Sequence, residues 1–198
     1  MFTITKENTM TLFRPRARLL RASLLSLLVA APLAFAGHLN ALLNADLDGR
    51  QEVAANATNN GMVGDPDGRG EFYVFSIDNT ATTPITVDAT VLCYNLQVKR
   101  IGELDLAPQM GTRMAHIHKG KLGTNGPVVA NLAWPQGGQA ADCLNAITQQ
   151  ARFNNVGINQ AQAVIADILT NPEQYYVNVH NAEFPAGALR GQLRVAQF

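Results

Sequence analysis

The stretch LCYNLQV, residues 92–98, ends the longest β-rich run of the chain and shows most clearly which kind of fold the sequence encodes. Its large apolar side chains alternate one by one with smaller or polar ones, Leu92, Tyr94, Leu96 and Val98 against Cys93, Asn95 and Gln97. Successive side chains of a β-strand point to opposite faces of the sheet, so a period of two predicts a strand with one buried face.

Further strand-like segments follow the same pattern and are separated by turns rich in Gly, Asn, Asp and Pro. They cover residues 39–47, 71–77, 112–118, 127–132, 175–180 and 188–195. The Ala- and Gln-rich segment 139–170 differs from them. There NQAQAVIADILTNP (159–172) predicts a short helix that Asn159 caps and Pro172 ends. The whole pattern predicts an all-β fold with one short helix, an antiparallel sandwich or barrel of the immunoglobulin-like or Cu/Zn superoxide dismutase-like kind.

The first 36 residues have the organisation of a secretory signal peptide. A basic stretch, RPRARLLR (14–21), precedes the apolar run LLSLLVAAPLAFA (24–36), which ends in the small-x-small triplet of a cleavage site. We therefore expect cleavage after Ala36, one mature β domain over 37–198, and a periplasmic or secreted location. The alternative is an uncleaved membrane anchor, although the apolar run is short for a permanent span.

Removal of the leader changes the charge of the protein. The basic cluster begins only at Arg14, which leaves Met1 and Met10 as alternative translation starts. The chain after Ala36 keeps ten basic and fourteen acidic residues, a formal charge of −4. A mildly acidic domain with scattered Lys and Arg lacks the basic patch that nucleic-acid binding requires, so we exclude nucleic acid as a partner.

The chain has two cysteines, Cys93 and Cys143. In an exported protein the simplest interpretation is one disulfide bond between them. Two free buried thiols, or a cysteine that binds a metal, are the alternatives.

Two of the four histidines lie in MAHIHKG, residues 114–120. On a strand, His116 and His118 point to the same face, together with Met114. The segments 175–180 and 188–195 also place polar groups opposite aliphatic ones, and those groups are Tyr176, Asn178, His180, Arg190 and Gln192. If these strands are neighbours in one sheet, the histidines and Arg190 gather on one face.

Three imidazoles on a rigid sheet suit copper or zinc, because both metals accept neutral nitrogen ligands. We expect His116, His118 and His180 to be the ligands, with Met114 or Glu183 as a fourth. Arg190 would orient a ligand or anion, or brace a loop carbonyl, and Asn178 and Gln192 would complete the polar cluster. The alternative is a solvated polar face.

Other chemistry finds little support in the sequence. The chain contains no GxSxG elbow, HExxH helix or Walker loop. The aspartate pairs 46/48 and 65/67 lack the spacing of a calcium loop and are interpreted as solvated turns. The fourth histidine, His38, stands at the expected mature N-terminus, where a flexible end is the simpler interpretation.

The segments LNADLDGRQEV, GRGEFYVFSI, LCYNLQV, AHIHKG, GPVVANL and YYVNVHNAEFPAGALRGQL together resemble the CHRD domain, a family named from chordin and widespread in bacterial secreted proteins. The resemblance covers roughly residues 40–196, and the two histidine-bearing segments are its most specific parts. It implies an all-β, usually exported protein in which His116, His118, His180 and Arg190 form a polar signature. Where the family often has an acidic residue this chain has Ala188, so a carboxylate that could pair with an arginine or a metal is missing.

These observations favour an exported CHRD-domain protein that acts by binding, with one copper or zinc ion on the three histidines. The first alternative is a protein-interaction or extracellular-matrix module that binds no metal. The second is an enzyme similar to superoxide dismutase. That enzyme needs more metal ligands than the chain supplies, since only His38 remains beside the three strand histidines.

Overall fold

The computed structural model describes residues 42–54, 63–76, 90–102 and 114–197. The predicted signal peptide and His38 lie outside these ranges. The strands are β1 (Leu42–Asp48), β2 (Arg69–Ser76), β3 (Val91–Lys99), β4 (Ala115–Lys119), β5 (Val128–Asn131), β6 (Gln139–Asn145), β7 (Tyr175–Val179), β8 (Leu189–Gln192) and β9 (Arg194–Val195). The α-helix α1 spans Ile158–Thr170, and short 3-10 helices span Gly49–Gln51, Gln136–Gly138, Gln150–Phe153 and Pro172–Gln174.

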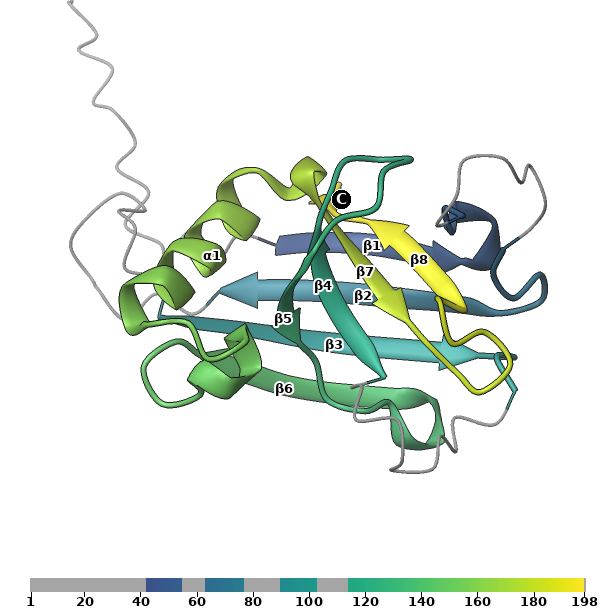
Figure 1. The fold of residues 1–198 in the computed structure, drawn as a ribbon, viewed down its shortest axis with the longest axis horizontal. Coiled ribbons are helices and arrows are strands. Elements are labelled where there is room, and N and C mark those ends of the chain that lie inside the picture. Colours follow the sequence, from purple (N-terminus) through teal and green to yellow (C-terminus); the bar gives the residue numbers. More distant parts are fainter. Residues whose placement is uncertain (1–41, 55–62, 77–89, 103–113, 198) are drawn as a thin grey trace, which may run out of the picture. The chain divides into compact units, whose positions relative to one another are not determined.

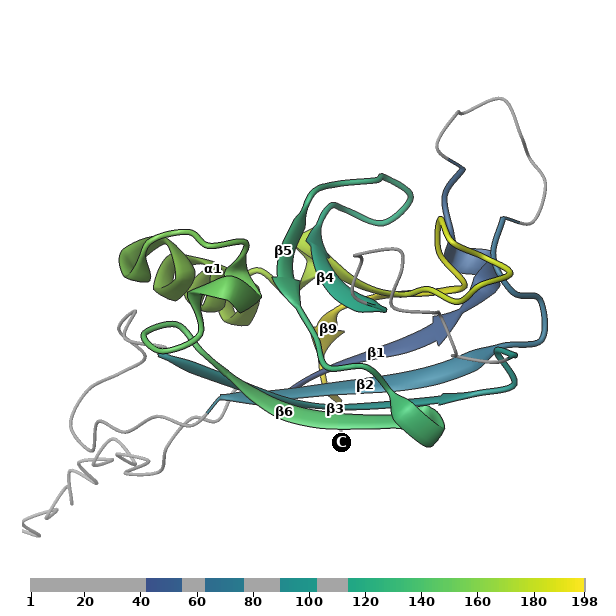
Figure 2. The ribbon, with the colours of Figure 1, turned by 60° about the horizontal axis from the view of Figure 1, so that its bottom comes forward.

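All strands belong to one antiparallel sheet with the order β5-β4-β7-β8-β1-β2-β3-β6, and β9 pairs with β1. The sheet curls, so that β4, β5, β7 and β8 lie over β1, β2, β3 and β6, as Figures 1 and 2 show. The predicted all-β antiparallel fold with one helix is therefore confirmed. It takes the form of one continuous curled sheet, a half-barrel, because β8 and β1 still pair where the two halves meet.

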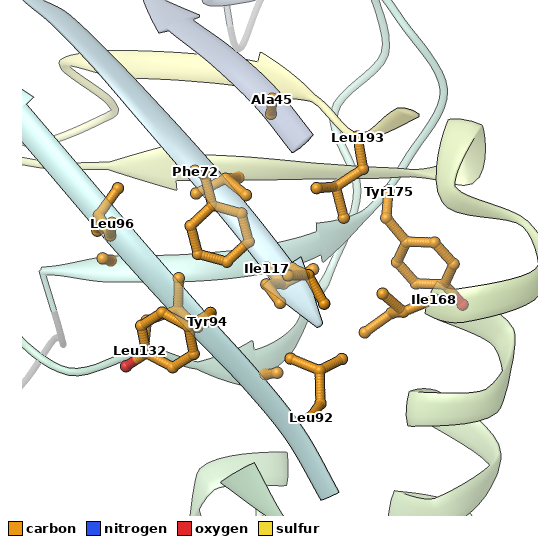
Figure 3. Close-up of a cluster of buried hydrophobic side chains, with 14 of the residues drawn as sticks. Ala45, Phe72, Leu92, Tyr94, Leu96, Ile117, Leu132, Ile168, Tyr175 and Leu193 are labelled. Atoms are coloured by element: carbon orange, nitrogen blue, oxygen red, sulfur yellow. The ribbon is translucent and has the colours of Figure 1, made fainter. Parts of the chain in front are cut away.

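The apolar core fills the space inside the curl (Figure 3). The large apolar side chains of LCYNLQV all point into it, as their alternation predicts, and the ring of Tyr94 stacks on that of Phe72 at 5.5 Å between centroids. The Tyr94 hydroxyl accepts a hydrogen bond from the backbone N–H of Ala133. Ile117 of β4 and Val177 of β7 enter the core from the opposite half of the sheet.

Three local features differ from the sequence-based expectation. The helix begins one residue before Asn159, and Gly157 occupies the N-cap position without a side-chain hydrogen bond, so the predicted Asn159 cap is wrong. The helix does end at Thr170, two residues before Pro172. The start of the Ala- and Gln-rich segment forms strand β6, which pairs with β3. Val195, an aliphatic residue of the alternating segment 188–195, is 63% exposed on the two-residue strand β9.

The two cysteines form the predicted disulfide. Cys93 of β3 and Cys143 of β6 are directly paired across the strands, with their Cα atoms 3.9 Å apart. Since β6 is an edge strand, the bond holds it to the sheet.

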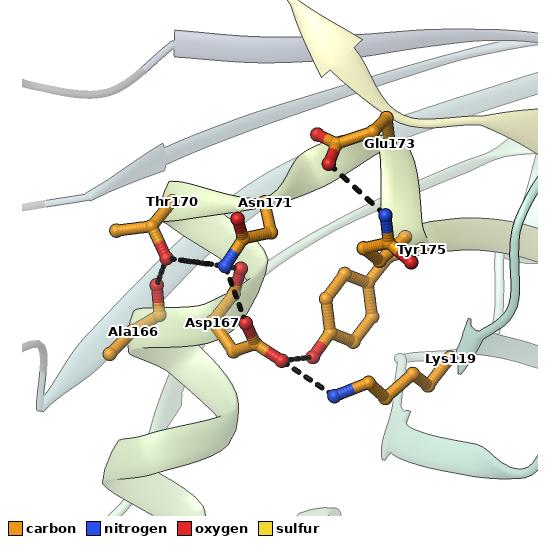
Figure 4. Close-up of polar contacts among 8 residues, drawn as sticks. Lys119, Ala166, Asp167, Thr170, Asn171, Glu173 and Tyr175 are labelled. Carbon is orange, nitrogen blue, oxygen red and sulfur yellow. Dashed lines mark hydrogen bonds and ion pairs between the residues drawn. The ribbon is translucent and has the colours of Figure 1, made fainter.

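The Asp167 carboxylate links α1 to the strands β4 and β7 of the histidine-bearing half of the sheet (Figure 4). It accepts hydrogen bonds from Lys119 Nζ at 2.7 Å, from Asn171 Nδ2 at 2.7 Å and from the Tyr175 hydroxyl. Lys119 and Tyr175 belong to β4 and β7. The hydrogen bonds from Lys119 and Tyr175 are the main cause that lowers the Asp167 pKa to about 2.

We expect Asp167→Asn to destabilise the protein by about 1 kcal/mol at pH 7, since the contact is partly solvent-exposed. The folded pKa of about 2 lies below the reference value of 3.8, so the carboxylate stabilises the fold above pH 4. That contribution is lost as the pH falls through 2. Urea unfolding at pH 7 and at pH 2.5 measures the difference; an unchanged difference between variant and wild type at both pH values would contradict the assignment.

Candidate metal centre

The three strand histidines lie on the sheet face opposite the apolar core. In the pairing of β4 with β7, His116 lies opposite Asn178, and His118 lies opposite Tyr176. The backbone N–H of His180 bonds to the carbonyl of Met114, which extends the same ladder by one pair. Because Ile117 and Val177 point into the core, their alternating neighbours must point to the outer face of this half of the sheet.

The predicted convergence of the histidines is confirmed. The nitrogen atoms that His116, His118 and His180 offer all lie within 4.8 Å of one another. His116 Nδ1 and His180 Nε2 are 3.3 Å apart. Two nitrogen ligands of a tetrahedral zinc ion, each at 2.0–2.1 Å from the metal, are separated by roughly 3.3 Å. This spacing equals that of two zinc ligands, and it is also that of the hydrogen bond between the two rings. To bind a metal through Nδ1, His116 would move its proton to Nε2.

Backbone carbonyls orient two of the rings. His118 Nδ1 lies 2.9 Å from the carbonyl oxygen of Gly126, and His180 Nδ1 lies 3.0 Å from that of Pro185. A carbonyl only accepts, so each Nδ1 carries a proton, and in the neutral ring each Nε2 keeps its lone pair. Metal-binding histidines typically have this outer hydrogen bond, which sets the tautomer and the ring orientation.

One ring nitrogen of His118 is unusual. His118 Nε2 is buried and has no hydrogen-bond partner among the described residues. His180 Nε2 has a partner, since the Nδ1–H of His116 is the donor in their 3.3 Å contact. Buried polar atoms are nearly always paired, and one that is not indicates strain, an ordered water or an ion.

Burial also favours the neutral form of two of the three histidines. Desolvation lowers the pKa of His118 below its ordinary value of 6.5, partly offset by the hydrogen bond to Gly126. Desolvation lowers the pKa of His180 for the same reason. Both imidazoles are therefore neutral at pH 7, which is the form that binds metals.

A loop formed by residues 120–126 covers the histidine face, and Arg190 holds it there. The Arg190 side chain is 1% exposed and donates to the carbonyls of Thr124 and Lys121 at 2.7 and 3.3 Å and to Asn125 Oδ1 at 3.2 Å. Its guanidinium carbon lies 3.5 Å from the centre of the Tyr176 ring, which stacks on His118. Of the roles expected for Arg190, the structure shows the bracing of loop carbonyls.

The loop approaches the sheet closely at Gly126. A Cβ at this position would lie 1.7 Å from the carbonyl oxygen of Lys119, so any side chain would push the loop away. Gly126 supplies the carbonyl that orients His118, and its N–H bonds to the Tyr176 hydroxyl. Only glycine allows the loop to reach the histidine from this distance.

The other predicted cluster residues have structural partners. Gln192 Nε2 donates to the carbonyls of Gly120, Glu173 and Tyr175 and so joins the loop to β7 and β8. Asn178 is 5% exposed and donates to a Glu52 carboxylate oxygen at 3.3 Å.

The two expected fourth ligands have different positions. Met114 is 5% exposed and directly precedes strand β4. Glu183 is exposed, and its carboxylate does not join the group of donor atoms around the histidines.

Sequence reasoning missed Glu52. This residue lies 126 positions before Asn178 in the chain and supplies a buried carboxyl on the histidine face. The absence of an acidic residue at position 188 was a signal that another part of the chain could provide one, but nothing in the sequence indicated which.

The structure therefore describes an all-β protein with one disulfide bond and a partly buried group of three histidines. The family model of the CHRD domain matches residues 43–193, and the chain therefore belongs to the CHRD family. No significant match was found among curated proteins or among solved structures.

The family and the disulfide indicate a protein of the extracellular kind, because disulfides persist in oxidising compartments. In the described ranges, no helix combines the length and the hydropathy that a bilayer crossing requires.

Proposed function

We propose that this protein is an exported metal-binding protein that holds one copper or zinc ion through His116, His118 and His180, in the periplasm or in the medium. The observation that carries the proposal is the arrangement of the three nitrogen donors within 4.8 Å of one another, with two rings oriented by backbone carbonyls. A solvated polar face needs neither the buried position of His116 nor the unpaired Nε2 of His118.

The chemistry of the donors supports copper or zinc in preference to calcium or magnesium. Imidazole nitrogen suits zinc and copper, whereas calcium and magnesium require several oxygen ligands. Met114, which is buried directly before β4, would add a soft thioether donor for Cu(I). Three protein ligands leave a further coordination position for Met114, for water or for an exogenous ligand.

Metal titration of the protein with Zn(II), Cu(II) and Cu(I), each in competition with a chromogenic chelator, tests the proposal. We expect one equivalent of tightly bound metal. Outer hydrogen-bond partners alone change metal affinity by 10–100-fold. The loss of a direct ligand in His118→Ala or His180→Ala should therefore weaken binding by more than about a hundredfold.

His38→Ala is the matched control, since it removes the remaining histidine of the chain and should leave the affinity unchanged. Uptake that survives in both strand variants but disappears in His38→Ala would assign the binding to the N-terminus and contradict the proposal. An absence of uptake by the wild type would favour the interaction-module alternative.

A further inference from the structure

We propose that Glu52 is the proton-linked partner of the histidine cluster, and that its carboxyl loses a proton when the three histidines take up a divalent cation. This inference rests on the proposed function and adds to it a group that regulates affinity without touching the ion.

One side chain separates Glu52 from the histidines. Glu52 Oε2 accepts a hydrogen bond from Asn178 Nδ2 at 3.3 Å. Asn178 is the direct cross-strand neighbour of His116, and it lies two positions before His180 on the same face. A charge placed among the imidazoles therefore acts on the Glu52 carboxyl over a short distance and past the buried Asn178.

The surroundings of Glu52 favour its neutral form in the metal-free protein. Glu52 Oε1 and Asn178 Oδ1 are both buried, and both lack a hydrogen-bond partner within the described part of the chain. Two such acceptors have no proton to share while Glu52 is a carboxylate. A protonated Glu52 provides the missing O–H donor.

Close packing buries one oxygen of this carboxyl, Oε1. A Cβ on Gly187 would lie 2.5 Å from Glu52 Oε1, and a Cβ on Gly64 would lie 2.6 Å from Glu52 Cγ, so the backbone presses against it from two sides. Desolvation by burial raises the Glu52 pKa to about 7, against smaller lowering effects from Arg190 and from the Asn178 hydrogen bond. Near pH 7 the carboxyl is therefore present partly as the neutral acid and partly as the carboxylate.

The other charged groups around Glu52 have their own hydrogen-bond partners or are exposed, although Arg190 also acts on Glu52 through its charge. Arg190 of β8 directs its guanidinium to the loop carbonyls. On the segment that contacts Glu52 through Gly64, the Asp65 carboxylate accepts from the N–H groups of Asp67 and Gly68. Asp48, before the 3-10 helix, accepts from Arg50 and Gln51. On the 181–187 loop, Glu183 is exposed. The histidine face itself carries the titratable side chains of His116, His118, His180 and Tyr176.

Metal binding and deprotonation of Glu52 should favour each other. A divalent cation at the histidines favours the carboxylate, so metal binding lowers the Glu52 pKa from about 7. By reciprocity, deprotonation of Glu52 strengthens metal binding, and a shift of one pKa unit corresponds to about a tenfold change in affinity. The affinity should rise as the pH passes through 7, beyond any rise that the histidines themselves cause.

Calorimetric titration with Zn(II) at pH 7, in two buffers of different ionisation enthalpy, measures the protons released per ion. We compare the wild type with Glu52→Gln, which keeps the neutral shape of the acid, and with Glu71→Gln, a control on an exposed carboxyl of the outer face of β2. For a group with a pKa near 7, the wild type and the control should release about half a proton more than Glu52→Gln.

The outcomes separate this inference from the proposed function. Equal proton release by all three proteins, with zinc still bound, overturns the role of Glu52 and leaves the metal site intact. No zinc uptake by the wild type overturns both. If Glu52→Gln does not fold, the 13C carboxyl resonance of Glu52 in the wild type decides. A midpoint near 7 that falls by at least one unit with Zn(II) supports the inference, and a midpoint near 4 or one that zinc leaves unchanged overturns it.

Discussion

Replacing Arg190 by alanine should lower the free energy of unfolding by about 3 kcal/mol, because it removes three charged hydrogen bonds and opens a cavity beneath the loop. The side chain is almost fully buried and holds the 120–126 loop through two carbonyls and Asn125. The ring of Tyr176 also loses the guanidinium that packs on it at 3.5 Å. A loosened loop would release the Gly126 carbonyl from His118, so zinc affinity should fall by about tenfold as well.

Urea unfolding and zinc titration of the same preparation measure both effects. Arg194→Ala is the matched control, since Arg194 is an exposed arginine on the neighbouring strand whose ion pair with Asp46 lies at the surface. We expect it to cost less than about 1 kcal/mol and to leave zinc binding unchanged. Arg190→Lys should fall between the two, because an ammonium keeps the charge but not the planar fork. Equal stabilities of Arg190→Ala and Arg194→Ala would refute the bracing role.

Loss of the disulfide should destabilise the protein by about 4 kcal/mol in the chain-entropy model, since Cys93 and Cys143 are 50 residues apart. The bond joins β3 to the edge strand β6, which lies at the opposite end of the strand order from β4 and β5. We therefore expect the double variant Cys93→Ala/Cys143→Ala to show faster amide exchange in β6 first. The histidine cluster should keep its zinc affinity as long as the variant remains folded.

Chemical denaturation of the oxidised wild type and of the double variant measures the free-energy difference, with hydrogen exchange to locate it. Cys143 is exposed whereas Cys93 is fully buried, so a reductant reaches the bond from the β6 side. Reduced wild type should match the double variant. A loss below about 1 kcal/mol would mean that strand pairing alone holds β6 and that the bond adds little.

Much of the fold could be predicted because its strands carry a regular period of two. LCYNLQV and the histidine strands bury the face that their alternation indicates. The prediction failed where pattern and context diverge. Residues 139–145 lack a clear alternation and become a strand because β3 offers them an edge to pair with. Asn159 resembles a helix cap in sequence, yet the helix already begins at Ile158.

The candidate site could be predicted only in part. Alternation correctly grouped His116 with His118, and it placed His180 on the corresponding face of its own strand. It could not decide which of its two expected roles Arg190 has, and the structure shows that Arg190 braces the 120–126 loop. It also could not show that Glu183 lies apart from the histidines. Glu52 could not be found at all, because no local pattern connects a residue after β1 with Asn178 on β7.

The alternation along each strand already showed which side chains share a face, because the direction of a side chain on a strand follows from local backbone geometry. The two cysteines predicted a disulfide, with free thiols or a metal ligand as alternatives, and the structure confirmed the bond. Which sheet faces come together, and which loop covers them, depends on the strand order and on contacts between distant parts of the chain. Strand order places β7 between β4 and β8, and this brings distant imidazoles within ligand distance of one another. The 120–126 loop then packs on that face, and burial raises the pKa of Glu52 and lowers the pKa values of His118 and His180.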